Sequence, residues 1–184
     1  MTEGRPFRTL GREELVSNPW HRYCRDRYVQ RDGSPGDYYY IDMPGSCASI
    51  PMFADGTVTL LRVHRYLLGE ELWEFPIGGM KRGEEPLEVA KKELREEAGL
   101  LAADWTPLGH FAPYKGVSTE RCHFFLAREL EQGPQSLEPS EQISVHRMPF
   151  ADARRVIIGQ ECGDGQSMAG LLLLDRWLAA GNCL

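Results

Sequence analysis

The stretch that decides the fold is GGMKRGEEPLEVAKKELREEAGL, which runs from Gly78 to Leu100. Pro86 suits the first turn of a helix, where its missing N–H is not needed, and Gly99 is a natural C-terminal stop. Between them, apolar residues recur at helical spacing, at Leu87, Ala90, Leu94 and Ala98. This pattern predicts a helix over residues 86–98 with one apolar stripe turned toward a core.

The same helix carries a crowd of acids near its C-terminal end. Glu93 and Glu97 share one face at i and i+4, and Glu96 lies one step around the helix. Like charges at this spacing repel each other, and the helix dipole prefers cations at this end. The acids are either a solvated charged face or a set of hard oxygen ligands for Mg²⁺ or Mn²⁺. Spacing alone does not decide between the two.

Composition narrows the class of protein. A chain of 184 residues, with 42% hydrophobic and 26% charged residues, is typical of one soluble globular domain with room for a small appendage. The net charge of −6 argues against a nucleic-acid-binding surface, although a metal ion could reverse the local sign for an anionic substrate. The five cysteines lack CxxC spacing and indicate reduced thiols in a cytoplasmic protein. The charged start is unlike a signal peptide, and no apolar run is long enough to span a membrane.

Strand patterns dominate the rest of the chain. Residues 1–19 are predicted to be a polar lead-in, and 131–142 a mobile loop. Residues 47–53 and 57–66 are expected to form a strand pair around the tight turn Asp55-Gly56. Further strands are expected at 20–30, 31–43, 72–77, 105–111, 120–130 and 142–149, and closing helices at 150–158 and 166–180. Runs of strands with few helices indicate an α/β (α+β) fold, with a mixed sheet flanked by helices.

The acid-rich stretch and its surroundings resemble the signature of the Nudix hydrolases. That signature is Gly, five residues, Glu, seven residues, and then Arg-Glu-hydrophobic-x-Glu-Glu-x-Gly-hydrophobic. Here Gly78 and Glu84 are followed by Lys92-Glu93-Leu94-Arg95-Glu96-Glu97-Ala98-Gly99-Leu100. Lys92 stands where the family has Arg; it keeps the charge but loses the planar fork that can hold two carboxylates. The resemblance implies a Nudix-type α/β/α sandwich with a mixed β-sheet.

The resemblance also implies metal-dependent hydrolysis of a pyrophosphate bond. Glu93 and Glu97 would be the principal ligands of Mg²⁺, with Mn²⁺ as an alternative, and Glu96 a further ligand or the residue that orients one. The backbone carbonyl of Ile77 would complete the ligand set, and Glu84 would be structural. Such a reaction needs charge neutralised on the phosphate oxygens and a water activated, and carboxylate-bound divalent cations supply both.

Outside the signature, the chain is similar to the ADP-ribose and nucleoside-diphosphate-sugar pyrophosphatase branch. In LLRVHRYLLGEELWEFPIGG, the resemblance places Arg65 on the substrate diphosphate and Glu74 near the substrate or metals. APYKGVSTERCHFFLARE resembles the second loop of this branch, in which Lys115 replaces the usual Pro and leaves the exact substrate open. The substrate-binding residues implied by this loop are Gly116, Ser118 and Glu120.

A second acidic segment, LEPSEQISV at 137–145, resembles the loop that carries the water-activating glutamate in this branch. Glu141 matches the last acid before the strand and is the predicted general base. Glu138 lies one residue before the position where a second acid is expected, at Pro139, and both Glu138 and Glu120 remain alternatives. A flexible loop that orders over the substrate would also exclude bulk water.

The branch implies a substrate and a mode of assembly. The expected reaction converts an ADP-sugar such as ADP-ribose, or a related NDP-sugar, into NMP and sugar phosphate, with no nucleic acid or membrane as partner. The alternatives are a dinucleoside polyphosphate or oxidised nucleotide as substrate, or a nucleotide-sensing module without turnover. The base, the sugar and the number of metal ions are not readable from the sequence.

The N-terminal segment matches the branch only in outline. Residues 1–43 are expected to form a small antiparallel β-sheet that makes a homodimer, with strand exchange left open, and 44–184 the Nudix hydrolase domain. The sheet carries tyrosines that could stack on a nucleobase or pack within the sheet, and the pattern does not choose between these roles. They are Tyr23, Tyr28, Tyr38, Tyr39 and Tyr40.

Overall fold

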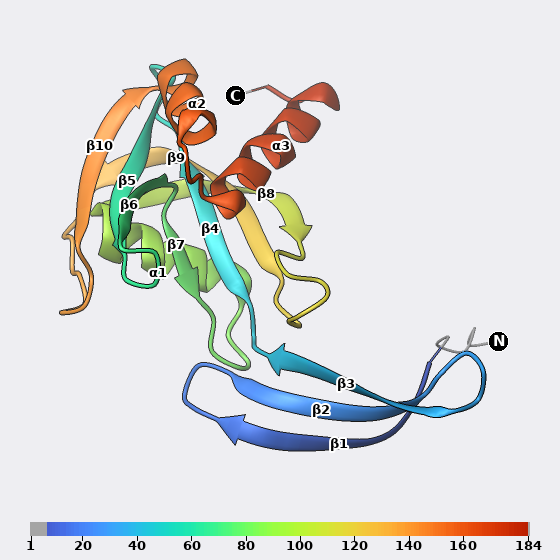
Figure 1. Ribbon diagram of the computed structural model, residues 1–184. Helices are drawn as coiled ribbons and strands as arrows, with labels where there is room; N and C mark the ends of the chain where they lie inside the picture. The colour runs from blue at the N-terminus through green and yellow to red at the C-terminus, as the bar shows by residue number, and fades with distance from the viewer. Residues whose placement is uncertain (1–6, 184) are drawn as a thin grey trace. The chain divides into compact units, whose positions relative to one another are not determined.

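The computed structural model describes residues 7–183, and Figure 1 shows their arrangement into ten strands and three helices. Contacts divide the chain into two compact units. The N-terminal unit holds the chain up to Pro44 together with Tyr114–Glu120. The main unit holds Gly45–Pro113 and the chain from Arg121 onward. No helix within residues 7–183 is both long and apolar enough to cross a bilayer.

The N-terminal unit is an antiparallel sheet in the order β1-β2-β3. Its strands are β1 (Arg8–Ser17), β2 (Arg22–Val29) and β3 (Pro35–Asp42). Residues 1–19 were predicted to be a polar lead-in, so the strand at residues 8–17 corrects that prediction, whereas residues 1–6 lie outside the described part. The strand was missed because charge pairs across the strands, such as Arg12–Asp26 and Arg25–Glu13, replace the usual apolar alternation.

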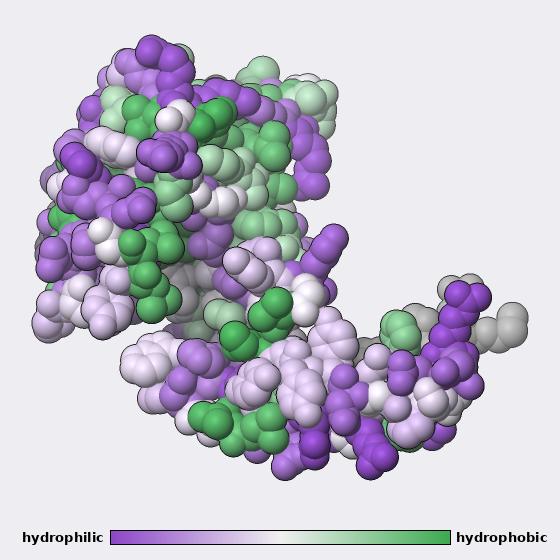
Figure 2. All heavy atoms as spheres, in the orientation of Figure 1, coloured by the Kyte–Doolittle hydropathy of each residue, from purple (hydrophilic) through white to green (hydrophobic). Residues whose placement is uncertain are grey.

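The segment Tyr114–Glu120 belongs to the N-terminal unit through its pairing with β3. The Ile41 N–H donates to the Val117 carbonyl at 2.8 Å, and the Thr119 N–H donates to the Ile41 carbonyl at 3.0 Å. Among the described residues of this unit, the buried hydrophobic side chains are Cys24 and Tyr40. Figure 2 shows apolar patches on the surface over these strands.

The main unit contains a mixed sheet in the order β7-β4-β9-β8. It consists of β4 (Ser46–Pro51), β7 (Ile77–Gly79), β8 (Leu100–Phe111) and β9 (Cys122–Gln132). β4 runs parallel to β9, and the other pairs are antiparallel. Every residue of β4 is buried, which places this strand at the centre of the unit.

A second, antiparallel sheet has the order β10-β5-β6, with β5 (Thr57–Arg65), β6 (Glu70–Glu74) and β10 (Ile143–Pro149). The predicted turn at Asp55-Gly56 is present, with Gly56 at φ +77°. The predicted pairing of the strands on either side of it holds only beside the turn: Met52, which follows β4, forms an antiparallel bridge with Val58 of β5, but β4 and β5 belong to different sheets. β7 and β9 already occupy both edges of β4, so β5 has no free edge to join.

The helices are α1 (Pro86–Ala98), α2 (Phe150–Gly159) and α3 (Gly165–Ala179). α1 has the predicted bounds, and Gly99 closes it at φ +64° by donating its N–H to the Arg95 carbonyl. Side chains alternate across the mixed sheet: Cys47 packs with Val89 and Ala90 of α1, whereas Ile50 packs with Leu171 and Leu174 of α3. The sheets therefore lie between α1 and the α2–α3 pair, and the predicted α/β/α fold class is confirmed.

Candidate active site

The predicted ligand Glu97 is buried where α1 meets β7. Glu97 is 6% exposed, and its Oε2 accepts a hydrogen bond from the Ile77 N–H at 3.0 Å. Burial, followed by the nearby charge of Glu93, raises the pKa of Glu97 well above its usual range, and the Ile77 N–H opposes this shift. A buried carboxylate next to another carboxylate is costly, so this position calls for a cation.

Glu93 lies against the main chain of the glycine loop. A Cβ at Gly78 would stand 2.0 Å from the Glu93 Cδ, whereas a Cβ at Gly79 would meet nothing within 4 Å. A side chain at position 78 would therefore displace the Glu93 carboxylate from where it lies, and Gly78 leaves room for this acid. Burial raises the pKa of Glu93, and Lys92 works in the opposite direction.

Lys92 bridges the acids from the position where the signature has Arg. Its Nζ lies 3.1 Å from the Glu93 Oε1 and 3.2 Å from the Glu96 Oε2, and the Arg95 Nη2 lies 3.0 Å from the Glu96 Oε1. Burial acts to raise the pKa of Glu96, but the hydrogen bonds and charges of Lys92 and Arg95 together lower it below its usual range. A single ammonium group thus contacts two carboxylates. Glu84 accepts the Lys81 N–H at 2.6 Å, which fits its predicted structural role in the loop.

Arg65 and Glu74 form an ion pair beside this cluster. The Arg65 Nε donates to the Glu74 Oε1 at 2.7 Å, and its Nη2 donates to Oε2. Glu74 is 2% exposed; burial raises its pKa while Arg65 opposes the shift. The hydrogen bond to Glu74, and to a smaller extent the charge of Glu97, raise the pKa of Arg65. The ion pair and the acids of α1 therefore share one electrostatic environment. The negative charge of Asp164, the N-cap of α3, also contributes to raising the pKa of both Arg65 and Glu74. Asp164 was not among the predicted site residues, although its Asp-Gly-Gln-Ser context is a typical helix start.

Glu141 is the acid of the 131–142 loop that acts on the buried glutamates. Its charge raises the pKa of both Glu93 and Glu97. Its side chain accepts the Glu138 N–H at 2.7 Å, and its own N–H donates to the Glu138 carbonyl at 3.0 Å. Glu138 thus contributes its main chain to a small turn that holds Glu141.

The remaining predicted substrate-binding residues lie in the N-terminal unit, on Tyr114–Glu120. The Gly116 carbonyl accepts a hydrogen bond from the Tyr38 hydroxyl at 2.9 Å. Ser118 forms an isolated parallel β-bridge with Ile41, and the Ser118 hydroxyl accepts a hydrogen bond from the Glu120 N–H at 3.3 Å. These contacts attach the loop to the N-terminal sheet, whereas the acids of α1, Arg65, Glu74 and Glu141 all lie in the main unit.

The NUDIX domain family matches residues 43–162, a range that contains α1, Arg65 and Glu141. The chain belongs to the Nudix family. The family predicted from the acid-rich stretch is therefore confirmed.

Two curated relatives match over nearly the whole Nudix chain. The ADP-ribose pyrophosphatase of Mycobacterium tuberculosis (strain ATCC 25618 / H37Rv) is 28% identical over 169 residues, which cover 90% of this chain and 82% of that protein. The ADP-ribose pyrophosphatase of Bacillus subtilis (strain 168) is 26% identical over 174 residues, 91% of this chain and 92% of that protein. The predicted resemblance to this branch is thereby confirmed.

The fold of this Nudix chain also matches a crystal structure of an ADP compounds hydrolase. The TM-score is 0.83 and the match covers 100% of both chains, at 18% sequence identity. At that identity the likeness supports the fold and not the substrate.

The acids of the Nudix signature suit a hard divalent cation. Carboxylate oxygens are the ligands that Mg²⁺ prefers, and a bound cation would offset the cost of two buried neighbouring carboxylates. Within residues 7–183, no three His, Cys, Asp or Glu side chains converge as a ready-made metal site. Here the Ile77 N–H holds Glu97 while Lys92 holds Glu93 and Glu96, so the side chains would turn to bind a metal.

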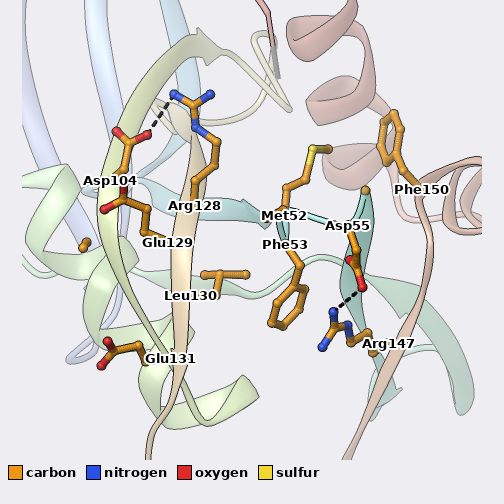
Figure 3. Close-up of a pocket in the computed structure, with 13 residues that line it drawn as sticks. Met52, Phe53, Asp55, Asp104, Arg128, Glu129, Leu130, Glu131, Arg147 and Phe150 are labelled. Carbon is orange, nitrogen blue, oxygen red and sulfur yellow. Dashed lines mark hydrogen bonds and ion pairs between the residues drawn. The ribbon is translucent and has the colours of Figure 1, made fainter.

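A cavity of about 1180 Å³ lies elsewhere in the main unit, and Figure 3 shows the side chains around it. Its wall includes two ion pairs, Arg128–Asp104 at 2.8 Å and Arg147–Asp55 at 2.7 Å. Four acids and two arginines line it, and both arginines are already paired, so it is poorly suited to an anionic diphosphate. None of the predicted site residues is among its lining residues.

Proposed function

We propose that this Nudix protein hydrolyses the pyrophosphate bond of ADP-ribose, or of a related ADP- or NDP-sugar, to NMP and sugar phosphate. The observation that carries the proposal is the buried pair Glu93 and Glu97, held against Ile77 and Gly78, with the Arg65–Glu74 ion pair beside it. The names of the two full-length relatives support the substrate class.

In the proposed mechanism, Glu93, Glu97 and Glu96 would hold Mg²⁺ together with the Ile77 carbonyl. Bound there, the metal would neutralise charge on the diphosphate oxygens and lower the pKa of a water. Arg65 contacts the diphosphate through the part of its guanidinium that Glu74 leaves free. Glu141 takes the proton as the water oxygen attacks one phosphorus, and the bridging P–O bond breaks to release the two phosphates.

A product-resolved assay tests the proposal. The purified protein is incubated with Mg²⁺ and ADP-ribose, ADP-glucose, GDP-mannose or diadenosine polyphosphates, and the products are separated by chromatography. We expect AMP and ribose 5-phosphate from ADP-ribose at the highest kcat/KM of the panel. A preference for the dinucleoside polyphosphates would favour the alternative enzyme. Tight nucleotide binding without any product would favour a sensing module.

We further propose that residues 1–43 form a dimerisation extension on a catalytic domain of residues 44–184. The N-terminal sheet buries few hydrophobic side chains, yet several large ones are more than a third exposed, and a second copy would cover them. They include Val16, Trp20, Tyr23, Tyr38 and Tyr39. Sedimentation analysis should give twice the mass of the chain, and a monomer at micromolar concentration would contradict this. The five cysteines form no disulfide within residues 7–183, which suits the proposed cytoplasmic location.

A further inference from the structure

The outer edge of β6 is covered by a side chain, not by a strand. β6 lies at the edge of the β10-β5-β6 sheet, where backbone N–H and C=O groups would otherwise remain unpaired. The Trp73 N–H donates to the Gln160 Oε1 at 2.6 Å, and the Gln160 Nε2 donates to the Trp73 carbonyl at 3.1 Å. One primary amide thus makes both bonds that a neighbouring strand would make to Trp73.

A second anchor lies two residues further along the chain. The Phe75 N–H donates to the Ser167 Oγ at 2.9 Å, and both residues are fully buried. Ser167 is itself fixed, because the Asp164 carboxylate that caps α3 accepts its N–H at 2.7 Å. Gln160, at the end of α2, and Ser167, in the first turn of α3, therefore hold the main chain on both sides of Glu74.

The stretch from Trp73 to Ile77, the anchored run, carries two elements of the candidate active site. Glu74 lies between Trp73 and Phe75 and holds the Arg65 guanidinium. Three residues after Glu74, the Ile77 N–H holds the Glu97 carboxylate. A displacement of this run would therefore move Arg65 relative to the acids of α1.

Stability alone does not require the Gln160 amide. Trp73 and Gln160 are both partly exposed, and water can satisfy the backbone groups of an edge strand nearly as well as a side chain. What the amide adds is a fixed position for the strand, since its two bonds define both the distance and the orientation of β6.

We propose that Gln160 is a positioning residue for the reaction. It touches no substrate; it holds β6 so that the Glu74–Arg65 pair presents its guanidinium to the diphosphate. The inference rests on the proposed function, because it needs Arg65 to bind the substrate.

The test is steady-state hydrolysis of ADP-ribose with Mg²⁺ by the full chain and its Gln160→Ala variant. Because Arg65 would bind the diphosphate in the ground state as well as the transition state, we expect KM to rise roughly tenfold with a smaller change in kcat. Gln160→Glu keeps an acceptor for the Trp73 N–H but places a carboxylate opposite the Trp73 carbonyl. The KM of Gln160→Glu should lie between those of the wild-type chain and Gln160→Ala. Gln160→Glu replaces the alanine variant if that variant does not fold.

Arg154→Ala is the matched control for loosening of the two helices. It removes the Arg154–Asp175 ion pair between α2 and α3, whose bonds are 2.9 and 2.6 Å long, without touching β6. We expect a lower thermal midpoint and an unchanged KM. An equal rise in KM for this variant would overturn the proposal, since it would trace the effect to general loosening.

A double-mutant cycle with Arg65→Ala gives the decisive readout. If Gln160 acts through Arg65, then Gln160→Ala adds little to the KM of the Arg65→Ala variant. A full further rise in that background, or a KM unchanged in the single variant, would also overturn the proposal. A wild-type chain that fails to hydrolyse ADP-ribose refutes the proposed function instead, and is recognised before any variant is measured.

Discussion

The acid cluster of α1 and the tyrosine-rich N-terminal sheet place their side chains in opposite environments, each of them unfavourable. In the first, the acidic side chains of Glu93 and Glu97 are buried. In the second, large apolar side chains such as Trp20 and Tyr39 are exposed, at 75% and 48%. Both arrangements cost free energy in an isolated chain. The difference lies in what would offset each cost: a divalent cation for the acids and a second protein surface for the aromatic side chains.

The largest effect is expected from removing one charge of the acid cluster. Glu97→Gln keeps the volume and an acceptor for the Ile77 N–H but loses the charge that would bind Mg²⁺, so kcat should fall roughly 10³-fold. The thermal midpoint without metal should stay the same or rise, because a buried charge is gone. Glu88→Gln on the same helix, which breaks an exposed Lys91 pair, should leave both quantities nearly unchanged. Near-normal turnover by Glu97→Gln would exclude Glu97 as a ligand.

Gly78 offers a steric test of the same cluster. In Gly78→Ala, the new methyl group would collide with the Glu93 carboxylate, so either the loop or the acid must move. We expect a loss of about 1–3 kcal/mol in the free energy of unfolding, together with reduced activity. Gly79→Ala, whose Cβ meets open space, should change stability by less than about 0.5 kcal/mol. Urea titrations measure the free energy of unfolding of both variants. Equal losses would show that the contact with Glu93 does not cause the loss in Gly78→Ala.

The N-terminal sheet can be tested by changing its exposed surface. Tyr39 stacks on Tyr23 with ring centroids 6.2 Å apart, and both rings are partly exposed. If a second copy covers them, Tyr39→Lys should shift the protein toward monomer and remove the concentration dependence of its thermal midpoint. Tyr66→Lys, at a 90% exposed tyrosine outside this sheet, is the control. Sedimentation velocity at several concentrations would contradict the dimer if wild type and Tyr39→Lys behave alike.

The smallest effect concerns the reactivity of the cysteines. Cys162 and Cys183 are exposed and should react with a thiol reagent within seconds in the native protein. Burial raises the pKa of Cys47 to about 12, and Cys122 is equally buried, so both should react only after unfolding of the main unit. Cys24 lies in the small core of the N-terminal sheet and should react at an intermediate rate, through local opening. Mass spectrometry of timed labelling reads these rates, and equal protection of Cys24 and Cys47 would show that the two regions unfold together.

Local signals allowed the most accurate predictions of the fold. Pro86 and Gly99 fixed both ends of α1, because capping depends on neighbouring residues alone. The turn at Asp55-Gly56 was predicted for the same reason. The pairing of β4 with β9 was not predicted, because strand pairing depends on distant parts of the chain. The strand β1 was not predicted either, because its charged residues are matched only by residues of the neighbouring strand.

The candidate site divides in the same way. The acids of α1 and Lys92 follow one another in a signature and could be found from the sequence. Gln160 and Ser167 could not, since their bonds to Trp73 and Phe75 join residues 87 and 92 positions apart. Their residue types are common, and only the folded chain shows which backbone groups they reach.

The Phe75–Ser167 hydrogen bond also bears on how the nascent chain acquires activity. Because this contact spans 92 positions, the anchored run beside the acids cannot be completed until α3 has left the ribosomal exit tunnel. The hairpins of the N-terminal sheet join strands adjacent in sequence and can form as soon as they emerge. During synthesis, the proposed assembly surface would therefore be ready well before the chemistry.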